Sequence, residues 1–252
     1  MLDATRAVEN ADFIARREAG YESRTVAQIL KEFCSHTDGC TMSGKKDALV
    51  NIGGWLALND EDRYEKAGNF VVVYEGLHTY GGMAGRDMEA MARGIVESLA
   101  DEHIRARLGQ VGYLDHKRMG ARAPVVRRIV GHAVYLDARA FDPHLDPGQF
   151  PAQSLAADRY GDCGVRARER GIVSTGRDRK SGQHHRPALE LVRLTIPRRI
   201  YTHAHMDLTA ESVIDVYARR SDARGLKRVY EPRYLRFLQA RFERLSTVAS
   251  AR

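Results

Sequence analysis

The chain has 252 residues, of which 43% are hydrophobic and 29% charged, a composition ordinary for a soluble globular protein of one large or two modest domains. It has no unbroken apolar run of the about 20 residues that span a bilayer and no signal-peptide pattern at its start, so we expect a cytoplasmic protein without a membrane partner. The net charge of +7 comes from scattered arginine doublets rather than from a basic stripe interleaved with aromatic residues, which argues against nucleic-acid binding.

The first third of the chain alternates amphipathic patterns with glycine-bearing segments. Helical spacing predicts a helix over 8–16 and a second over 26–33, with Thr25 as its N-cap. The polar stretch 36–42 is expected to be a loop, and the apolar, β-branched run 48–56 is expected to be a buried strand. The acidic residues 59–62 favour the start of a helix that ends near Tyr74.

The rest of the chain predicts an α+β arrangement. After a glycine-rich turn at 75–82, apolar residues at helical spacing from 83 to 114 predict one long, bent helix that joins two domains and closes at Gly120. Strands are expected at 125–130, 133–137, 165–168 and 189–196, and helices at 152–160 and 206–219. The pattern over 233–245 fits a helix or a strand equally well.

Two lysines, Lys45 and Lys46, stand at the mouth of the predicted strand 48–56. In one interpretation both stems lie along apolar surface while the ammonium groups reach water. In the other, one amine is partly desolvated and a cationic neighbour lowers its pKa, which makes it a nucleophile and a base. Periodicity alone does not decide between the two.

The segment 38–54 around these lysines resembles the cofactor-lysine segment of the tyrosine phenol-lyase and tryptophanase family, whose members are pyridoxal-phosphate-dependent β-eliminating lyases. The resemblance extends through the blocks 73–76, 80–82, 85–90, 150–157 and 192–199. It implies an α/β fold of the aspartate aminotransferase-like kind (fold type I). Residues 1–100 would be the C-terminal part of the cofactor-binding large domain, and residues 101–252 the α+β small domain.

On the cofactor side, the resemblance assigns five residues. Lys46 falls on the lysine that forms the Schiff base and removes the Cα proton, and Lys45 and Ser43 fall near the cofactor phosphate. Asp3 matches the aspartate that keeps the pyridine nitrogen protonated, and Arg6 matches the arginine beside the ring oxygen. A protonated pyridine ring is the electron sink that the reaction needs.

On the substrate side, Arg193 matches the arginine that binds the α-carboxylate, a task that suits a planar guanidinium. Arg170 and Phe237 match residues near the phenol ring in the phenol-lyase branch, so the resemblance implies β-elimination of L-tyrosine to phenol, pyruvate and ammonia. Cleavage of L-tryptophan to indole is the alternative. Leu238 and Thr175 depart from the phenylalanine and alanine usual at their positions.

The resemblance also implies a monovalent cation, potassium or another, held by the backbone carbonyl of Asn51, and a homotetramer. The chain resembles the C-terminal half of the family's sequence. We therefore expect a truncated lyase with little or no activity alone, or else a non-catalytic remnant.

Overall fold

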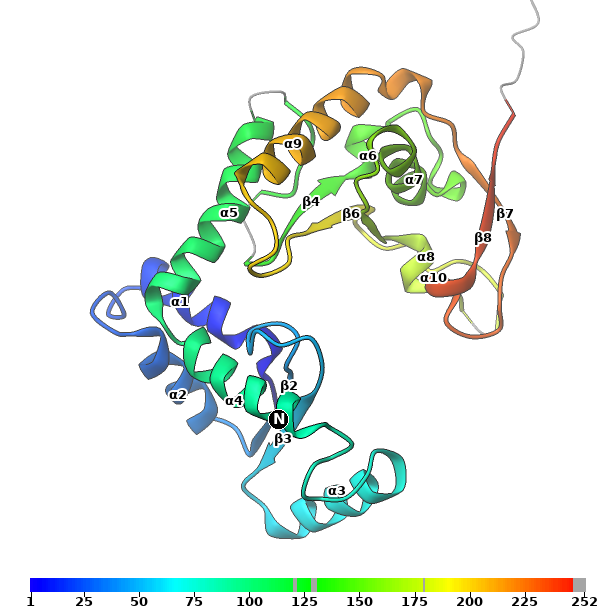
Figure 1. The fold of residues 1–252 in the computed structure, drawn as a ribbon. Helices are drawn as coiled ribbons and strands as arrows, with labels where there is room; N and C mark the ends of the chain where they lie inside the picture. The colour runs from blue at the N-terminus through cyan, green and yellow to red at the C-terminus, as the bar shows by residue number, and fades with distance from the viewer. Residues whose placement is uncertain (120–121, 128–130, 179, 247–252) are drawn as a thin grey trace, which may run out of the picture. The chain divides into compact units, whose positions relative to one another are not determined.

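The computed structural model describes residues 1–119, 122–127, 131–178 and 180–246. The chain divides into two compact units, Met1–Gly109 and Gln110–Arg252. No helix in the described ranges is long and apolar enough to cross a membrane. Figure 1 traces both units, and the elements of each are taken separately below.

The first unit is built on a three-stranded sheet of order β1-β2-β3, in which β1 runs parallel to β2 and β3 antiparallel to it. Its elements are β1 (Leu2–Asp3), η1 (Ala4–Arg6), α1 (Ala7–Arg17), α2 (Val26–Ser35), β2 (Gly39–Ser43), β3 (Gly54–Leu58), α3 (Glu61–Tyr74) and α4 (Gly85–Ser98). The predicted helices α1, α2 and α3 are confirmed. Thr25 caps α2 as expected, because its hydroxyl accepts a hydrogen bond from the Gln28 N–H.

Two predictions for this unit are wrong. The stretch 36–42 contains most of β2, and only the end of the run 48–56 belongs to a strand, β3. The backbone takes positive φ at Leu49 (60°) and Gly53 (88°), which interrupts an extended chain. Ala48 is apolar because it is buried in a cluster with Met42 and Met91, not because it lies in a strand.

The expected single helix from 83 to 114 is also wrong, since α4 ends at Ser98 and α5 (Asp101–Met119) begins after a break. The N–H groups of Leu99 and Ala100 bond three residues back, which tightens and ends α4. Asp101 and Glu102 then occupy the first turn of α5, where carboxylates are favourable. Gly120 lies outside the described residues.

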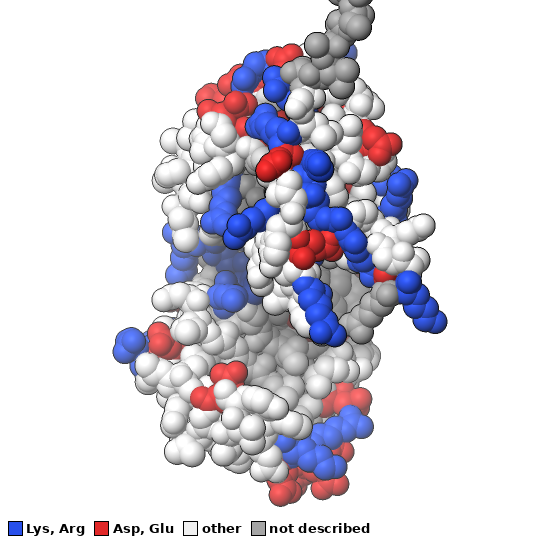
Figure 2. Space-filling view, turned by 90° about the vertical axis from the view of Figure 1, so that its right-hand side faces the viewer, with Lys and Arg blue, Asp and Glu red and all other residues white. Residues whose placement is uncertain are grey.

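The second unit centres on an antiparallel sheet of order β4-β6-β5, with a separate β7-β8 hairpin. Its elements are β4 (Ala133–Asp137), α6 (Ala138–Phe141), η2 (Pro147–Gln149), α7 (Pro151–Cys163), β5 (Arg168–Arg170), α8 (Ile172–Thr175), β6 (Leu191–Thr195), α9 (His203–Ala218), η3 (Arg220–Asp222), β7 (Leu226–Tyr230), α10 (Arg236–Gln239) and β8 (Arg241–Arg244). Residues of α5, α7 and α9 bury one core with the sheet. Figure 2 shows basic side chains interspersed with acidic ones on one face.

Predictions for β4, β6, α7 and α9 are confirmed to within a few residues. The strand expected at 165–168 lies slightly later, at Arg168–Arg170, and β7 was not expected. The ambiguous stretch 233–245 contains both a helical turn, α10, and a strand, β8. In the strand expected at 125–130, Val125 makes only an isolated bridge to Leu136, and residues 128–130 lie outside the described ranges.

Candidate active site

Lys46 lies in the loop between β2 and β3, half-buried, whereas Lys45 is exposed. The Lys46 Nζ donates a hydrogen bond to the Ser43 Oγ at 2.7 Å. Ser43 is held in turn, because its backbone N–H donates to the Thr5 Oγ1 at 3.2 Å. These two hydrogen bonds hold the Lys46 amine next to the Ser43 hydroxyl and link the loop to Thr5, near the first residue of the sequence.

Asp47 clamps this loop from one side. Its buried carboxylate accepts a hydrogen bond from the Val8 N–H at 3.1 Å, across 39 positions of sequence. Helix α1 has no capping side chain of its own at Arg6, so Asp47 satisfies one of its first-turn N–H groups. The loop and the N-terminus of α1 therefore hold each other in place.

Helix α4 clamps the loop from the other side. A Cβ added at Gly94 would lie 1.7 Å from the Ala48 carbonyl oxygen, so only glycine allows this approach of the two backbones. A Cβ at Gly44 would meet the Met91 sulfur at 3.1 Å. The backbone that carries Lys46 is thus packed directly against α4.

Asp3 and Arg6 lie at the same end of this unit, before α1. Asp3 is exposed, and the Asp3 Oδ1 accepts a hydrogen bond from the Thr5 N–H at 3.0 Å. Hydrogen bonds from Thr5, with smaller contributions from the charges of Arg6 and Lys46, hold the pKa of Asp3 below its usual value. The sequence-predicted residues Asp3, Arg6, Ser43 and Lys46 are therefore brought together, with Asp3 ionised.

In the second unit, the predicted arginines share one face of the sheet. Arg168 pairs directly with Arg193 across β5 and β6, and Arg170 follows two residues later in β5, so all three point to the same side. Burial, and then the charges of Arg193 and Arg168, lower the pKa of Arg170. On the opposite face, Glu169 and Val192 are buried.

Phe237 lies beside this arginine face. The Arg168 guanidinium sits 5.5 Å from the centroid of the Phe237 ring. Phe237, Leu238 and Arg193 line one cavity of about 880 Å³ together with Arg168 and Thr195. The cavity thus combines guanidinium groups, which can bind a carboxylate, with the aromatic ring of Phe237.

The structure gives a local reason for the residue at one of two further positions, Thr175, and none for the other, Asn51. The Thr175 hydroxyl lies 2.9 Å from the His185 carbonyl and ties the following loop to α8, which gives a local reason for a threonine there. Asn51 is exposed in the β2–β3 loop. No cluster of three acidic, histidine or cysteine side chains in the described ranges is arranged to hold a metal ion. The cation at Asn51 stays a prediction.

Sequence reasoning missed Asp47 and Arg168. Asp47 was visible only as the polar end of the lysine segment, because its partner Val8 lies in a different helix. Arg168 carried a usable signal, since it shares the period-two alternation of Arg170 along β5.

A family model described as beta-eliminating lyase matches residues 1–212. The chain belongs to the beta-eliminating lyase family. Beta-eliminating lyases similar to it include the tyrosine phenol-lyases of Nostoc punctiforme, 67% identical over 96% of this chain and 52% of the relative, and of Pasteurella multocida, 58% identical over 96% and 53%. The chain therefore spans about half the length of the curated relatives it matches.

The fold of the chain resembles that of a serine palmitoyltransferase solved with pyridoxal phosphate as its internal aldimine. The two share a TM-score of 0.52 and 12% identity over 76% of this chain and 42% of the other. The predicted α/β fold, that of pyridoxal-phosphate enzymes of fold type I, is confirmed. The chain contains only part of that fold.

Beta-eliminating lyases depend on pyridoxal phosphate, and the residues of the first unit fit that group. A cofactor with an aldehyde, a phosphate and a basic ring nitrogen needs an amine, hydrogen-bond donors and a carboxylate. Lys46 would supply the amine, Ser43 a hydroxyl 2.7 Å from that amine, and Asp3 an ionised carboxylate. Lys45 adds a second cation at the same loop.

Proposed function

We propose that the chain forms the lysine-bearing half of a pyridoxal-phosphate-dependent lyase that cleaves L-tyrosine by β-elimination to phenol, pyruvate and ammonia. The observation that carries the proposal is the position of Lys46. Its amine is held by Ser43 at 2.7 Å and lies near enough to Asp3 for its charge to contribute to the lowered pKa of that carboxylate.

Bound pyridoxal phosphate would supply an electron sink for the charge that develops at Cα. Asp3, ionised, would hold the proton on the ring nitrogen, and Ser43 with Lys45 would face the phosphate. Lys46 would take the proton from Cα, a role for which its hydrogen bond to Ser43 orients the amine.

The substrate groups would be bound by the arginine face of the second unit. Arg193 would hold the α-carboxylate through its planar guanidinium. Arg170, the neighbour on that face whose pKa is lowered by burial, would donate to the phenol oxygen and favour departure of the ring. Phe237 lines the cavity that contains Arg193 and would contact the aromatic ring.

We favour tyrosine over tryptophan because Arg170 would offer a hydroxyl-bearing ring a hydrogen-bond partner. The relatives in Nostoc punctiforme and Pasteurella multocida carry the name tyrosine phenol-lyase. A potassium or similar ion at the Asn51 carbonyl, a homotetramer, a cytoplasmic location and a division into a large domain (1–100) and a small domain (101–252) complete the proposal.

The test joins this sequence at Met1 to the preceding half of the Nostoc punctiforme relative and compares the joined protein with the 252-residue chain alone. With pyridoxal phosphate and tyrosine, the joined protein should form an imine absorbance band and release phenol. The Lys46→Ala version should show neither, and the chain alone should show little or no phenol release.

Indole release from tryptophan without phenol release from tyrosine would instead identify a tryptophanase. Phenol release that survives Lys46→Ala would remove Lys46 from its proposed role and with it the observation on which the proposal rests.

A further inference from the structure

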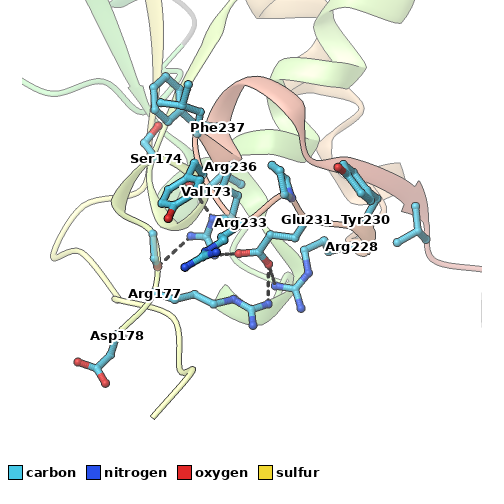
Figure 3. A pocket seen from close by; sticks show the side chains of 15 residues that line it. Val173, Ser174, Arg177, Asp178, Arg228, Tyr230, Glu231, Arg233, Arg236 and Phe237 are labelled. Carbon is cyan, nitrogen blue, oxygen red and sulfur yellow. Dashed lines mark hydrogen bonds and ion pairs between the residues drawn. The ribbon is translucent and has the colours of Figure 1, made fainter. Parts of the chain in front are cut away.

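A second cavity of the second unit, of about 900 Å³, lies between α8 and the segment that links β7 to α10. Figure 3 shows the side chains that line it. Among the described residues, four arginines face it against two carboxylates: Arg177, Arg228, Arg233 and Arg236, with Asp178 and Glu231. It adjoins the cavity of Arg193, sharing Ser174 and Phe237, but contains none of the three arginines of the sheet face.

One carboxylate, that of Glu231, serves three of these guanidinium groups. Its Oε2 lies 2.6 Å from the Arg177 Nη2 and 2.6 Å from the Arg228 Nη1. Its Oε1 lies 3.4 Å from the Arg236 Nη1. Three cations around one anion leave the centre of the cluster positively charged.

The second carboxylate does not reduce this excess. Asp178 accepts hydrogen bonds from the Lys180 and Ser181 N–H groups at 3.0 and 2.7 Å, and its side chain points away from the arginines in Figure 3. Meanwhile the Arg177 Nε is buried without a hydrogen-bond partner in the described structure. A buried guanidinium nitrogen without an acceptor is costly unless something supplies one.

His184 adds a second shortage of acceptors. Its Nδ1 lies 2.8 Å from the Arg236 Nη1, and its Nε2 lies 3.3 Å from the Arg228 Nη1. Burial and the charges of Arg236 and Arg177 lower the pKa of His184, which favours the neutral ring. Because a neutral imidazole has only one acceptor nitrogen, one of these arginine contacts sets N–H against N–H.

Arg233 stands at the exposed mouth of the cavity, with its guanidinium 5.1 Å from the ring centroid of Tyr234. Tyr230 and Phe237 also line the opening. A ligand entering here would meet a cation first and flat aromatic surfaces beside it.

From these contacts we propose that this cavity is a binding site for a phosphate monoester, distinct from the cofactor-binding loop of the first unit. A phosphate dianion brings acceptor oxygens to the Arg177 Nε, which has no hydrogen-bond acceptor in the described structure, and arginine forks match its geometry. The Arg236 guanidinium, by contrast, already donates to the carbonyls of Val173 and Gly176. The two charges of the phosphate balance the excess that Glu231 leaves. The aromatic side chains suit a flat organic body attached to the phosphate.

The test is isothermal titration calorimetry of the 252-residue chain at constant ionic strength, first with inorganic phosphate and then with adenosine monophosphate as a flat-bodied ester. Both should bind, the ester more tightly. Arg233→Ala and Arg177→Ala should each weaken binding about tenfold, the effect of losing one charged hydrogen bond.

The matched control is Arg220→Ala. Arg220 is also exposed and stacks on a tyrosine, with its guanidinium 4.3 Å from the Tyr217 ring, but it lies outside this cavity. The Arg220→Ala variant should bind phosphate as tightly as the unchanged chain does. A binding event that Ser43→Ala removes and Arg177→Ala leaves intact would belong to the proposed cofactor loop, which separates the two sites.

Glu231→Gln provides a test that does not depend on removing an arginine. It deletes the carboxylate that competes for the guanidiniums, so phosphate should bind about tenfold more tightly and raise the melting temperature of this variant more than that of the unchanged chain. Absence of binding and of stabilisation in both proteins would overturn the proposal, as would an equal loss of affinity in Arg220→Ala. Binding of phosphate with no gain for the ester would identify the free ion as the ligand.

Discussion

Lys46 and Asp47 are adjacent in sequence but have partners of different kinds. The Lys46 amine faces Ser43 at a half-buried position, whereas the Asp47 carboxylate is buried against the N-terminus of α1. The first contact concerns the proposed chemistry and the second the stability of the fold. Substitutions at the two positions should therefore separate activity from folding.

Asp47→Ala should lower the free energy of unfolding by about 1–3 kcal/mol, because it leaves the Val8 N–H without its capping acceptor in a buried place. Urea denaturation followed by circular dichroism measures this change. Lys46→Ala, the control, should change stability by about 1 kcal/mol or less. An Asp47→Ala protein as stable as the unchanged chain would show that α1 does not need this cap.

Gly94→Ala should lower the free energy of unfolding by about 1–3 kcal/mol, since the new methyl group would collide with the Ala48 carbonyl and force α4 away from the lysine loop. Gly109 is a matched control in α5, because no atom lies within 4 Å of the position that its Cβ would take. There, alanine should stabilise the chain by about 0.5–1 kcal/mol through helix propensity. Equal effects at both glycines, measured by denaturation, would contradict the close approach.

Asp142 should make the chain less stable as the pH rises. It is 1% exposed, neither carboxylate oxygen has a hydrogen-bond partner in the described residues, and burial raises its pKa from 3.8 to about 7. A carboxyl whose folded pKa is raised binds more protons when folded, so its penalty is absent below about pH 4 and complete above about pH 7. Asp142→Asn should therefore stabilise the chain by up to about 4 kcal/mol at pH 8 and hardly at all at pH 4. Denaturation midpoints that shift equally at both pH values would contradict this.

Among the elements, the pair β5 and β6 sets the chemistry of the second unit. Its antiparallel register places Arg168 opposite Arg193 and puts Arg170 on the same face, while Glu169 on the other face accepts the Val173 N–H at 3.1 Å. Strand β5 therefore presents arginine side chains on one face of the sheet, and on the other face its Glu169 carboxylate anchors α8.

Arg170→Ala, in the joined protein, should reduce tyrosine cleavage far more than elimination from β-chloroalanine, whose chloride leaves without needing a hydrogen bond from the enzyme. Steady-state kinetics with the two substrates measures the ratio. Arg193→Ala serves as the comparison, because loss of α-carboxylate binding should affect both substrates alike. Equal losses in Arg170→Ala would remove that residue from the leaving-group role.

Elements with a strong helical period were predictable from sequence, as α1 and α2 illustrate. The lysine loop was not, because Ala48 is buried in a cluster with Met91 of α4 and the backbone takes positive φ at Leu49 and Gly53, neither of which the apolar pattern reveals. The proposed site residues were predicted from family resemblance rather than from pattern. No local rule connects Asp3 to Lys46, since the link depends on the parallel pairing of β1 with β2.

At the scale of the whole molecule, the chain spans about half the length of its relatives, and α3 has no buried residue. Large apolar side chains are exposed on this helix, namely Tyr64, Phe70, Val72, Val73 and Tyr74. A helix of this length gains most of its stability from packing, so α3 in the chain alone has little support.

Amide hydrogen exchange in α3 should therefore be much faster than in α1 in the 252-residue chain, because α1 packs against α2. In the protein joined to the preceding half of a relative, α3 should become more protected if that half covers it. Exchange measured by mass spectrometry compares the two helices within one sample. Equal protection of α3 and α1 in the chain alone would contradict this expectation.

The double clamp on the lysine loop also constrains how such genes can recombine. The loop meets the Val8 N–H on one side and Gly94 on the other. The groups at Val8 and Ala48 are backbone atoms, which any residue supplies, so a chimera of two relatives keeps both contacts wherever the crossover falls, provided that it retains Asp47 and Gly94. Shuffled libraries should therefore recover folded proteins mainly from crossovers that retain this pair.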